Sequence, residues 1–470
     1  QERTLTESAQ RTLIVGAGEA GRMIAQGIRA DGRVAGRYHL VAFVDDDPAK
    51  KTVAGIPVRH SIDALREIVL EDAIDVIFIA VPSAGGALLG RIIDRVGDLP
   101  IRLRILPGLR EIIDGDASWR ALRDVRPEDL LGREEIQFER ERLAAFYEDA
   151  RVMVTGGGGS IGSEICRQLL ALPVARVVAF GHGENSLYHL QQELGGDPRF
   201  VCQIGDVRDA EKIERTIAAW SISDIFHAAA HKHVPLMESF PDEAVKNNVY
   251  GSFVVARAAG RARIRRFLMV STDKAVRPSS VMGATKRVAE RIVLGMNGDG
   301  SGTRYAVTRF GNVLGSRGSV LPLFVEQIRR GGPVTVTHPE VTRYFMSIRE
   351  AARLVVKAAT LDCGEIFVLD MGQPVNIHEL ARRLVMLSGR HPDEVPIVIT
   401  GLRPGEKLHE ELWTEHEDLA ASPFEKLLVA RDSGGRMETA EVQRFIESMD
   451  PPLSAGDRET VRSILFTAAR

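Results

Sequence analysis

Four consecutive glycines, placed between an expected strand and an expected helix, restrict the fold of this 470-residue chain more than any other feature. The strand is the apolar run Arg151–Val154, and the glycines lie in the segment Thr155–Glu164, TGGGGSIGSE. Gly156, Gly159 and Gly162 recur at every third position. Glycines at this spacing let backbone N–H groups approach a pyrophosphate at the N-terminus of the following helix. A plain tight turn would not need them, so the run predicts a dinucleotide-binding βαβ unit.

Apolar segments alternate with helical patterns along most of the chain and predict further strands. They are Thr12–Val15, Leu40–Val44, Val76–Val81, Ile101–Leu106, Arg176–Phe180, Phe200–Ile204, Ile225–His227, Phe267–Val270 and Tyr305–Arg309. The alternation predicts an α/β fold with two Rossmann-like, doubly wound parallel-sheet domains, the second with a smaller C-terminal substrate-binding subdomain. The expected parts are a disordered tail (1–10), a first domain (11–125), a connector (126–148), a catalytic domain (149–435) and a helical tail (436–470).

The first domain has a glycine motif of its own. Gly16, Gly18 and Gly21 follow an expected strand with GxGxxG spacing, and Asp45–Asp47 follows the next strand. An acidic residue at that distance can accept a hydrogen bond from a ribose hydroxyl. Two interpretations stay open: the domain binds a nucleotide, or the glycines only allow a helix to pack closely on a strand. No catalytic group accompanies the motif, so we expect a positional or regulatory role.

Three polar groups follow the expected strand Phe267–Val270. They are the hydroxyl of Thr272, the carboxylate of Asp273 and the ammonium group of Lys274. Ligands of open α/β sheets bind at the carboxyl ends of the strands. An acid beside a base suits an elimination, because one group protonates the leaving group while the other removes a proton. The alternative is a solvated turn with an incidental ion pair.

The residues after these polar groups predict a helix that begins at Pro278–Ser280, since proline and serine are typical of helix starts. Met282 and Lys286 lie four positions apart on this helix and therefore share a face. Lys286 is thus expected beside the polar groups of the strand end, whereas Met282 also fits a packed core position.

Composition makes several other classes of protein poor matches. The net charge of −3 gives no reason to expect nucleic acid as a partner. The three cysteines are scattered, and His231 and His233 have no carboxylate or cysteine cluster beside them, so we expect no metal. No apolar run is long enough to span a bilayer, and no signal peptide is evident. The chain begins at Gln1 rather than at Met, as a piece of a longer protein would.

Five motifs of the chain occur together in one known family. They are Thr155–Glu164, His227–Glu238, Val270–Lys286, Arg309–Ser319 and Arg403–Leu408. The second domain thereby resembles the extended short-chain dehydrogenase/reductase family and, within it, the large CapD-like nucleotide-sugar 4,6-dehydratases of bacterial polysaccharide and glycan synthesis. The first domain and Asp129–Arg133 also resemble that group. In it, transmembrane helices precede the first domain. The resemblance thus implies that a segment absent from this chain holds the full-length protein at the cytoplasmic face of the bacterial inner membrane.

The resemblance implies a UDP-sugar substrate such as UDP-N-acetylglucosamine and a 4-keto-6-deoxy product. Hydride leaves C4 of the sugar for a nicotinamide, the new ketone acidifies the C5 proton, water leaves from C6 and the hydride returns to C6. Asp273 is the expected acid and Lys274 the expected base. A lysine base needs a lowered pKa, from burial or from a cationic neighbour such as Lys286. The resemblance to the large members suggests retention at C5, and it leaves room for a homo-oligomer.

The sequence departs from the wider family at two positions. Met282 stands where that family has the tyrosine of its YxxxK motif, so the base at C4 stays open among Thr272, Asp273 and a water molecule. Gly181 stands where an aspartate often holds the adenosine ribose, which weakens the case for NAD. Yet Phe180–Glu193 contains no arginine or lysine for a 2′-phosphate. NAD is therefore preferred to NADP by a small margin.

The family motifs also predict which residues bind the cofactor and the substrate. Expected at the cofactor are Gly156, Gly159, Ser160, Ile161, Gly162, Glu184, Asn185, Asp206, Val207, Ala228, Ala229, Ala230 and Lys286. Expected at the substrate are Lys232, Asn248, Asn312, Arg343, Arg403 and Glu406. Arg343 could pair with the diphosphate, or it could be a surface arginine paired with nearby carboxylates. A nucleotide-sugar 4-epimerase and a non-catalytic nucleotide-binding scaffold are the competing functions.

Overall fold

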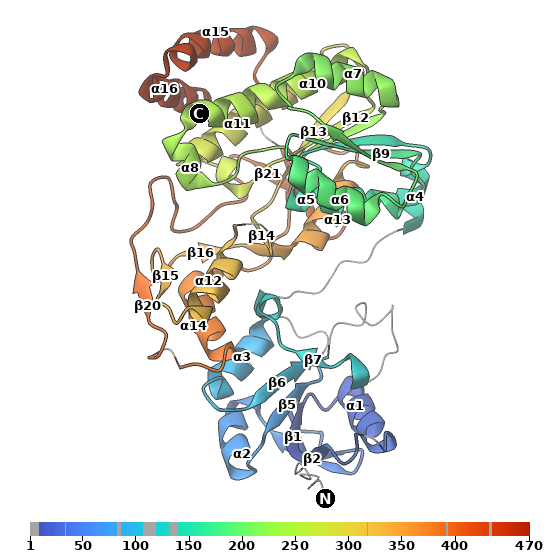
Figure 1. Cartoon of the computed structure of the whole chain (residues 1–470), viewed down its shortest axis with the longest axis vertical. Helices are drawn as coiled ribbons and strands as arrows, with labels where there is room; N and C mark the ends of the chain where they lie inside the picture. Colours follow the sequence, from blue (N-terminus) through green and yellow to red (C-terminus); the bar gives the residue numbers. More distant parts are fainter. Residues whose placement is uncertain are drawn as a thin grey trace, which may run out of the picture. The chain divides into compact units, whose positions relative to one another are not determined.

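The computed structural model describes residues 9–32, 34–81, 86–106, 119–131, 140–316, 318–391, 393–431 and 435–470. The chain divides into two compact units (Figure 1). The first unit consists of Gln1–Glu135, Gly318–Pro339 and Asn376–Thr400, and the second of Ile136–Arg317, Glu340–Val375 and Gly401–Arg470.

A seven-stranded sheet forms the centre of the first unit, in the order β3-β4-β2-β1-β5-β6-β7. Its strands are β1 (Gln10–Val15), β2 (Tyr38–Asp45), β3 (Thr52–Val53), β4 (Ile56–His60), β5 (Val76–Ile79), β6 (Arg102–Ile105) and β7 (Arg123–Asp124). The five strands from β4 to β6 are parallel, and the two edge strands are antiparallel to their neighbours. Its longer helices are α1 (Glu19–Ala30), α2 (Leu65–Glu71) and α3 (Gly86–Val96).

The glycine motif of the first unit makes a close turn between β1 and α1. A Cβ atom added at Gly21 would lie 2.0 Å from the carbonyl oxygen of Gly16. The carboxylate of Asp45 accepts hydrogen bonds from the Ala17 backbone N–H (2.7 Å) and from Lys50 Nζ (3.0 Å). Close packing therefore accounts for Gly21, and protein groups already engage the acidic residue expected at a ribose.

A second part of the first unit comes from far along the chain. It contains α12 (Val320–Arg329), β15 (Val334–Val336), α14 (Ile377–Leu387) and β20 (Ile397–Ile399). Helix α14 packs on α3, where Arg382 and Arg383 bind the carboxylate of Asp94 at 2.6 and 2.9 Å. Gly90 permits this approach, because a Cβ atom there would lie 2.5 Å from Arg383 Nη1. Two segments expected in the catalytic domain are thus grouped with the N-terminal Rossmann sheet.

The second unit is built on a nine-stranded sheet in the order β10-β9-β8-β11-β12-β13-β18-β22-β21. The strands are β8 (Arg151–Thr155), β9 (Arg176–Gly181), β10 (Phe200–Ile204), β11 (Asp224–His227), β12 (Arg266–Val270), β13 (Arg304–Arg309), β18 (Ile366–Leu369), β21 (Asp418–Ala421) and β22 (Leu427–Arg431). All but β21 and β22 are parallel. The strand order reverses between β8 and β11, whose last residues Thr155 and His227 are paired. That reversal is where open α/β sheets bind ligands.

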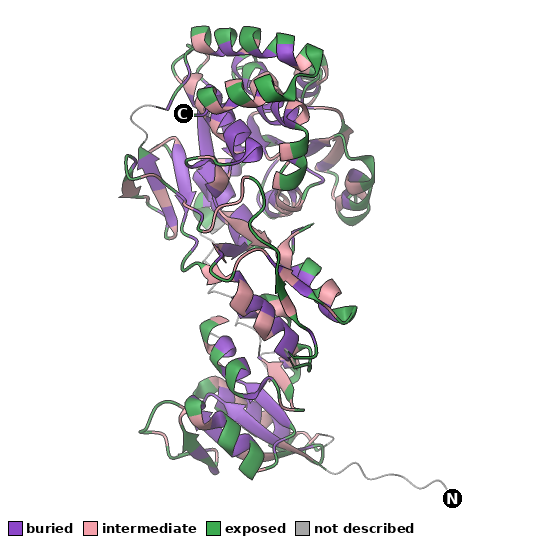
Figure 2. Cartoon of the chain, turned by 90° about the vertical axis from the view of Figure 1, so that its left-hand side faces the viewer, coloured by how far each residue is buried: buried purple, intermediate pink, exposed green. Residues whose placement is uncertain are grey.

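Helices cover this sheet and continue into a C-terminal pair. They are α4 (Arg140–Tyr147), α5 (Ser160–Leu170), α6 (Glu184–Leu194), α7 (Ala210–Trp220), α8 (Val234–Ser239), α9 (Pro241–Ala244), the π-helical η4 (Val245–Tyr250), α10 (Gly251–Arg261), α11 (Val281–Gly295), α13 (Ile348–Ala358), α15 (Thr439–Ala455) and α16 (Arg458–Ala468). Phe445 of α15 and Leu465 of α16 share a hydrophobic cluster with Val281 and Met282 of α11. Figure 2 shows the strands as buried and the outer faces of the C-terminal helices as exposed. No helix in the described ranges is both long and apolar enough to cross a membrane.

A buried ion network ties α11 to the sheet of the second unit. Arg309, at the end of β13, binds Glu290 of α11 and Glu417 at 2.7 Å each. Ser271, just after β12, donates a hydrogen bond of 2.6 Å to Glu290. Arg309 and Glu290 are at most 1% exposed, so this contact fixes α11 over the ends of β12 and β13.

The fold class is confirmed, and a strand lies at each expected position. Helix α11 follows Ser280, and α15 and α16 lie within residues 436–470, where a helical tail is expected. The short strands β3, β4, β7, β14 (Asn312–Leu314), β15, β16 (Thr342–Arg343), β17 (Phe345–Ser347), β18, β19 (Val375–Asn376) and β20–β22 were not predicted, because two to five residues give little periodicity. Of the expected N-terminal tail and connector, residues 1–8 and 132–139 lie outside the described residues, and Gln10 already belongs to β1.

Glu290→Gln should destabilise the second unit by about 3–5 kcal/mol, because it removes one partner of a buried ion pair. Glu193→Gln is the matched control, since Glu193 also binds an arginine, Arg167, but its side chain is 48% exposed. Its effect should stay below about 1 kcal/mol. Thermal unfolding of both variants checks the difference, and equal midpoints would show that the buried network does not hold α11.

Candidate active site

The glycine-rich turn after β8 lies at the reversal of strand order. Gly156 has φ +68, and a Cβ atom there would lie 2.7 Å from the backbone nitrogen of Ala229. A Cβ atom at Gly162 would lie 2.3 Å from the carbonyl oxygen of Gly156. Gly159 is the N-cap of α5, and Ser160 and Ile161 form its first turn. Side chains at Gly156 and Gly162 would thus collide with backbone atoms, and only glycine lets the turn close this tightly. The turn leads directly into the N-terminus of α5, whose free backbone N–H groups are what a pyrophosphate site requires.

The other residues expected at the cofactor lie along the same sheet edge. Glu184 and Asn185 begin α6 after β9, Asp206 and Val207 follow β10, and Ala228, Ala229 and Ala230 follow β11. The carboxylate of Asp206 binds Arg208 at 2.7 Å, and this hydrogen bond lowers the pKa of Asp206. A Cβ atom added at Gly181, at the end of β9, would meet no other atom within 4 Å. The structure thus brings the predicted set together at the carboxyl ends of β8–β11.

Asp273 opens the 3₁₀ turn η5 (Asp273–Ala275) immediately after β12, and its side chain is fully buried. Its Oδ1 accepts hydrogen bonds from Thr272 Oγ1 (2.8 Å) and from Lys274 Nζ (2.9 Å). Its Oδ2 is buried without a hydrogen-bond partner among the described residues. It lies 3.2 Å from the position that a Cβ atom would take at Gly311. One carboxylate oxygen is thus fixed by protein groups while the other remains available.

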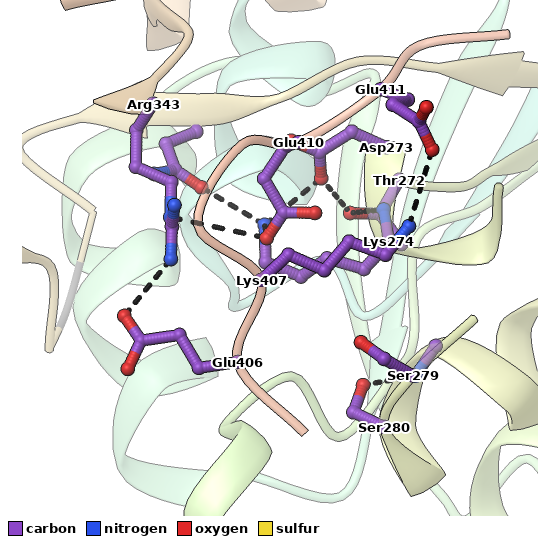
Figure 3. A network of polar contacts seen from close by, with 12 residues as sticks. Thr272, Asp273, Lys274, Ser279, Ser280, Arg343, Glu406, Lys407, Glu410 and Glu411 are labelled. Carbon is purple, nitrogen blue, oxygen red and sulfur yellow. Dashed lines mark hydrogen bonds and ion pairs between the residues drawn. The ribbon is translucent and has the colours of Figure 1, made fainter. Parts of the chain in front are cut away.

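Lys274 lies between two carboxylates (Figure 3). Besides its contact with Asp273, its Nζ is 3.5 Å from Glu410 Oε1 and 3.3 Å from Asn312 Oδ1. Burial lowers the pKa of Lys274, but the charges of Asp273 and Glu410 outweigh burial, and the pKa is raised. The expectation that burial or Lys286 lowers this pKa is therefore not met in the structure. The expected pair is an ion pair in which lysine holds the proton.

Lys286 lies under the end of β12, where its Nζ donates a hydrogen bond of 2.8 Å to the carbonyl of Val270. Burial lowers the pKa of Lys286 to about 8, against the charge of Glu290. His227 is also buried there, between Thr155 Oγ1 (2.7 Å) and Ser252 Oγ (2.9 Å). Burial and the charge of Lys286 lower the pKa of His227 to about 3, so this ring is neutral.

Met282 is 4% exposed and packs in the apolar cluster shared with the C-terminal helices. It lies one turn before Lys286 on α11, as the sequence predicts. A buried thioether has no proton to exchange, so the structure supports the interpretation of Met282 as a packed core residue. The identity of a base at C4 stays open.

The residues expected at the substrate divide into two sets. Arg343 is buried and binds Glu406 Oε1 at 2.9 Å, with Glu410 Oε1 at 3.9 Å, so it is not a surface arginine (Figure 3). Arg403 is exposed, and its backbone N–H donates to Glu406. Lys232 Nζ is 3.4 Å from Ser316 Oγ, and burial lowers the pKa of Lys232. Arg343 and Lys274 both face Glu410, and Lys274 Nζ is 3.3 Å from Asn312 Oδ1, so these three residues lie in one polar region.

Asn248 is the exception. Its amide oxygen accepts from the backbone N–H of His231 and from Asn247, at 2.8 and 3.0 Å. Its amide nitrogen donates to the His231 carbonyl and to Thr285 Oγ1, each at 3.0 Å. The side chain is fully buried and its hydrogen-bonding capacity is used. Asn248 therefore holds the loop after β11 against α11 and is not placed to bind a substrate.

Glu410 is the residue at this site that the sequence reasoning missed. It lies two positions after the motif Arg403–Leu408, in the run His409–Glu411. Its side chain is 3% exposed. Only the fold brings this segment over η5, through the hydrogen bond from Lys407 Nζ to the Val276 carbonyl (2.9 Å).

The described residues contain no group of three or more histidine, cysteine or carboxylate side chains arranged to hold a metal ion. His231 and His233 flank Lys232 after β11. Burial lowers the pKa of both imidazoles.

The chain is similar to known proteins over most of its length. Residues 152–432 match the family model described as polysaccharide biosynthesis protein, and residues 2–107 match the one described as CoA-binding domain. The chain is 42% identical over 447 residues to the probable polysaccharide biosynthesis protein EpsC of Bacillus subtilis, covering 94% of this chain and 74% of the relative. It is 43% identical over 425 residues to the capsular polysaccharide biosynthesis protein CapD of Staphylococcus aureus, covering 88% and 70%.

Among solved structures, Pen from Bacillus thuringiensis is 32% identical and aligns with a TM-score of 0.57, over 62% of this chain and 91% of Pen. Residues 152–432, which match the family model, include the glycine-rich turn, the Asp273–Lys274 pair and Arg343. The chain therefore belongs to the polysaccharide biosynthesis protein family and, within it, to the CapD-like nucleotide-sugar dehydratase group whose motifs it carries.

Proposed function

We propose that this protein is an NAD(P)-dependent UDP-N-acetylglucosamine 4,6-dehydratase. It would make the UDP-4-keto-6-deoxy sugar for bacterial polysaccharide or glycan biosynthesis, with retention at C5. The observation that carries this proposal is the ion pair between buried Asp273 and half-buried Lys274 at the end of β12, with Asp273 Oδ2 unengaged among the described residues. An elimination needs an acid and a base side by side, and this pair supplies both.

The glycine-rich turn fits a nicotinamide dinucleotide, because Gly156 and Gly162, where a Cβ atom would collide with the backbone of Ala229 and of Gly156, let the turn close tightly before the N-terminus of α5, where a pyrophosphate would bind. Lys286 would hold the nicotinamide ribose, and Ala228–Ala230 would leave room for the ring. When bound, the cofactor supplies a reversible hydride exchange with the sugar carbons C4 and C6. NAD stays preferred to NADP by a small margin, because the segment Phe180–Glu193 contains no arginine or lysine to bind a 2′-phosphate.

The Asp273–Lys274 hydrogen bond gives a balanced proton path for the elimination. In the ion pair, Lys274 carries the proton and Asp273 accepts its hydrogen bond at 2.9 Å. Movement of that proton to Asp273 produces a neutral amine and a carboxylic acid. The amine removes the C5 proton while the acid protonates the C6 hydroxyl, and water leaves. Lys274 is then protonated and Asp273 ionised, so the pair has returned to its starting state.

Arg343 and Arg403 are the proposed partners of the UDP diphosphate, with Asn312, Glu406 and Lys232 near the sugar. Displacement of Glu406 from Arg343 by a diphosphate would exchange one anion for another, so the buried guanidinium stays paired. Attachment of the full-length protein to the inner membrane, through a segment outside this chain, is part of the same proposal.

A nucleotide-sugar 4-epimerase would use the same cofactor turn but would need no acid and base at C5 and C6. The Asp273–Lys274 pair therefore favours the dehydratase. A mass spectrum of UDP-N-acetylglucosamine incubated with the protein separates the dehydratase from the two other functions. A dehydratase gives a product lighter by one water molecule, whereas an epimerase and a non-catalytic scaffold both leave the mass unchanged. The NMR spectrum of the sugar then shows whether C4 has been inverted, as an epimerase requires.

Asp273→Asn should slow the elimination by roughly 10²–10⁴-fold, because an amide cannot protonate the C6 hydroxyl. The fold and the amount of bound cofactor should not change, since Asn can still accept from Thr272 Oγ1. Mass-spectrometric rates of water loss, together with cofactor content after denaturation, check this. Turnover near that of the unmodified protein would exclude Asp273 as the acid.

Lys274→Ala should abolish exchange of the C5 proton with deuterated solvent, because the base is removed. Lys246→Ala is the control, since Lys246 also pairs with carboxylates, but with Asp242 and Glu243 of α9 rather than with Asp273 or Glu410. The control should keep the exchange. If Lys274→Ala exchanged the C5 proton at the normal rate, another group would be the base.

A further inference from the structure

Glu410 is a buried carboxylate held between two cations (Figure 3). Its Oε1 is 3.5 Å from Lys274 Nζ and 3.9 Å from Arg343 Nε. Its Oε2 is buried and has no hydrogen-bond partner in the part of the chain that the structure describes. A buried carboxylate with an unengaged oxygen is costly, so its position beside the proposed base needs an explanation.

The backbone around Glu410 aims this side chain at Lys274. Lys407 Nζ donates to the Val276 carbonyl at 2.9 Å, which ties the segment to the turn after β12. The Leu408 carbonyl accepts from the Thr342 N–H (3.0 Å) and from Arg343 Nη1 (3.2 Å), which ties it to β16. The segment is therefore held on both sides of the site, and the contact with Lys274 is built into the fold.

Three charged groups face Lys274, each from a different element. Asp273 lies on η5, Glu410 on the segment after residue 400, and Arg343 on β16, while Asn312 on β14 is neutral. Asp273 is the hydrogen-bonding partner, and it must gain a proton when Lys274 becomes a neutral amine. Glu410 is the negative charge that remains beside Lys274 during that transfer. Its carboxylate favours the protonated lysine, and the cation of Arg343 opposes it.

We propose that Glu410 is a positioning residue that holds Lys274 against Asp273 and sets how readily Lys274 gives up its proton. If the protein is the proposed dehydratase, on which this part of the inference rests, Glu410 fixes the pH range of the elimination. The raised pKa of Lys274 is consistent with this arrangement. A purely structural Glu410 would instead serve Arg343 alone, yet Glu406 already binds that guanidinium at 2.9 Å.

Glu410→Gln removes the charge and keeps the shape, so it should lower the pKa of Lys274 by about one unit or more. In the proposed path the active pair carries one proton, on Lys274, and it is inactive once that proton is lost to solvent. The limb on which activity falls as the pH rises should therefore move to lower pH. The KM for UDP-N-acetylglucosamine should stay near its value in the unmodified protein, and Glu410→Asp, which keeps the charge, should restore much of the original profile.

Glu411→Gln is the matched control. Glu411 is the next residue, but its side chain is 36% exposed and pairs with Arg277 and Lys407 rather than with Lys274. Its profile of kcat against pH should superimpose on that of the unmodified protein. A Glu410→Gln profile that superimposes as well, at a reduced rate, would show a merely structural role and overturn the inference.

A second readout does not depend on the reaction. The rate at which acetic anhydride acetylates Lys274, followed by peptide mass spectrometry across a pH range, reports the fraction of neutral amine. Glu410→Gln should shift this curve to lower pH, and Glu411→Gln should not. A shifted curve in a protein that dehydrates no UDP-sugar would refute the proposed function and keep the role of Glu410, whereas an unshifted curve would refute that role.

Discussion

The buried ion pair between Arg309 and Glu290 determines where α11 lies, and the catalytic unit depends on that placement. Arg309 ends β13, Glu290 is on α11, and Ser271 after β12 binds the same carboxylate. The helix therefore cannot slide along the sheet without leaving a buried charge unpaired. Lys286 lies one turn before Glu290, and so the network also places Lys286 Nζ at the Val270 carbonyl.

The charged residues of the proposed active site form a second network in the same unit. Asp273 and Lys274 come from the turn after β12, and Arg343, Glu406 and Glu410 come from segments more than sixty positions further along the chain. Their charges alternate in sign, and most of the side chains are buried. Such a network is stable only when each cation keeps a carboxylate, which explains why Lys274 holds its proton in this state. Chemistry then requires a proton to move within the pair rather than a lysine that is already neutral.

Much of this architecture follows from local patterns. The strands before Gly156 and Thr272 are apolar runs with polar ends, so both the cofactor turn and the acid–base pair could be placed at strand ends from sequence. Other features depend on contacts between distant segments. Glu410 looks like any charged residue in a polar run, and Asn248 looks free until its four hydrogen bonds are seen.

The division into units also depends on contacts between distant segments, which the sequence pattern does not reveal. Helix α14 has the apolar spacing of any amphipathic helix, and nothing in that spacing indicates which sheet it will cover. Its packing on α3 depends on Asp94, nearly 300 positions earlier, and on the absence of a side chain at Gly90. The first unit, with its match to a CoA-binding domain, thereby includes segments that the motifs alone assign to the catalytic half.

The central claim is that one site oxidises C4, eliminates water across C5 and C6, and reduces C6. The most direct test follows the hydrogen at C4. UDP-N-acetylglucosamine that carries deuterium at C4 is incubated with the protein, and the product is examined by NMR. The account predicts deuterium in the C6 methyl group of a 4-keto-6-deoxy sugar. Deuterium that is recovered at C4 of an epimerised sugar, or in unreacted substrate alone, would contradict it.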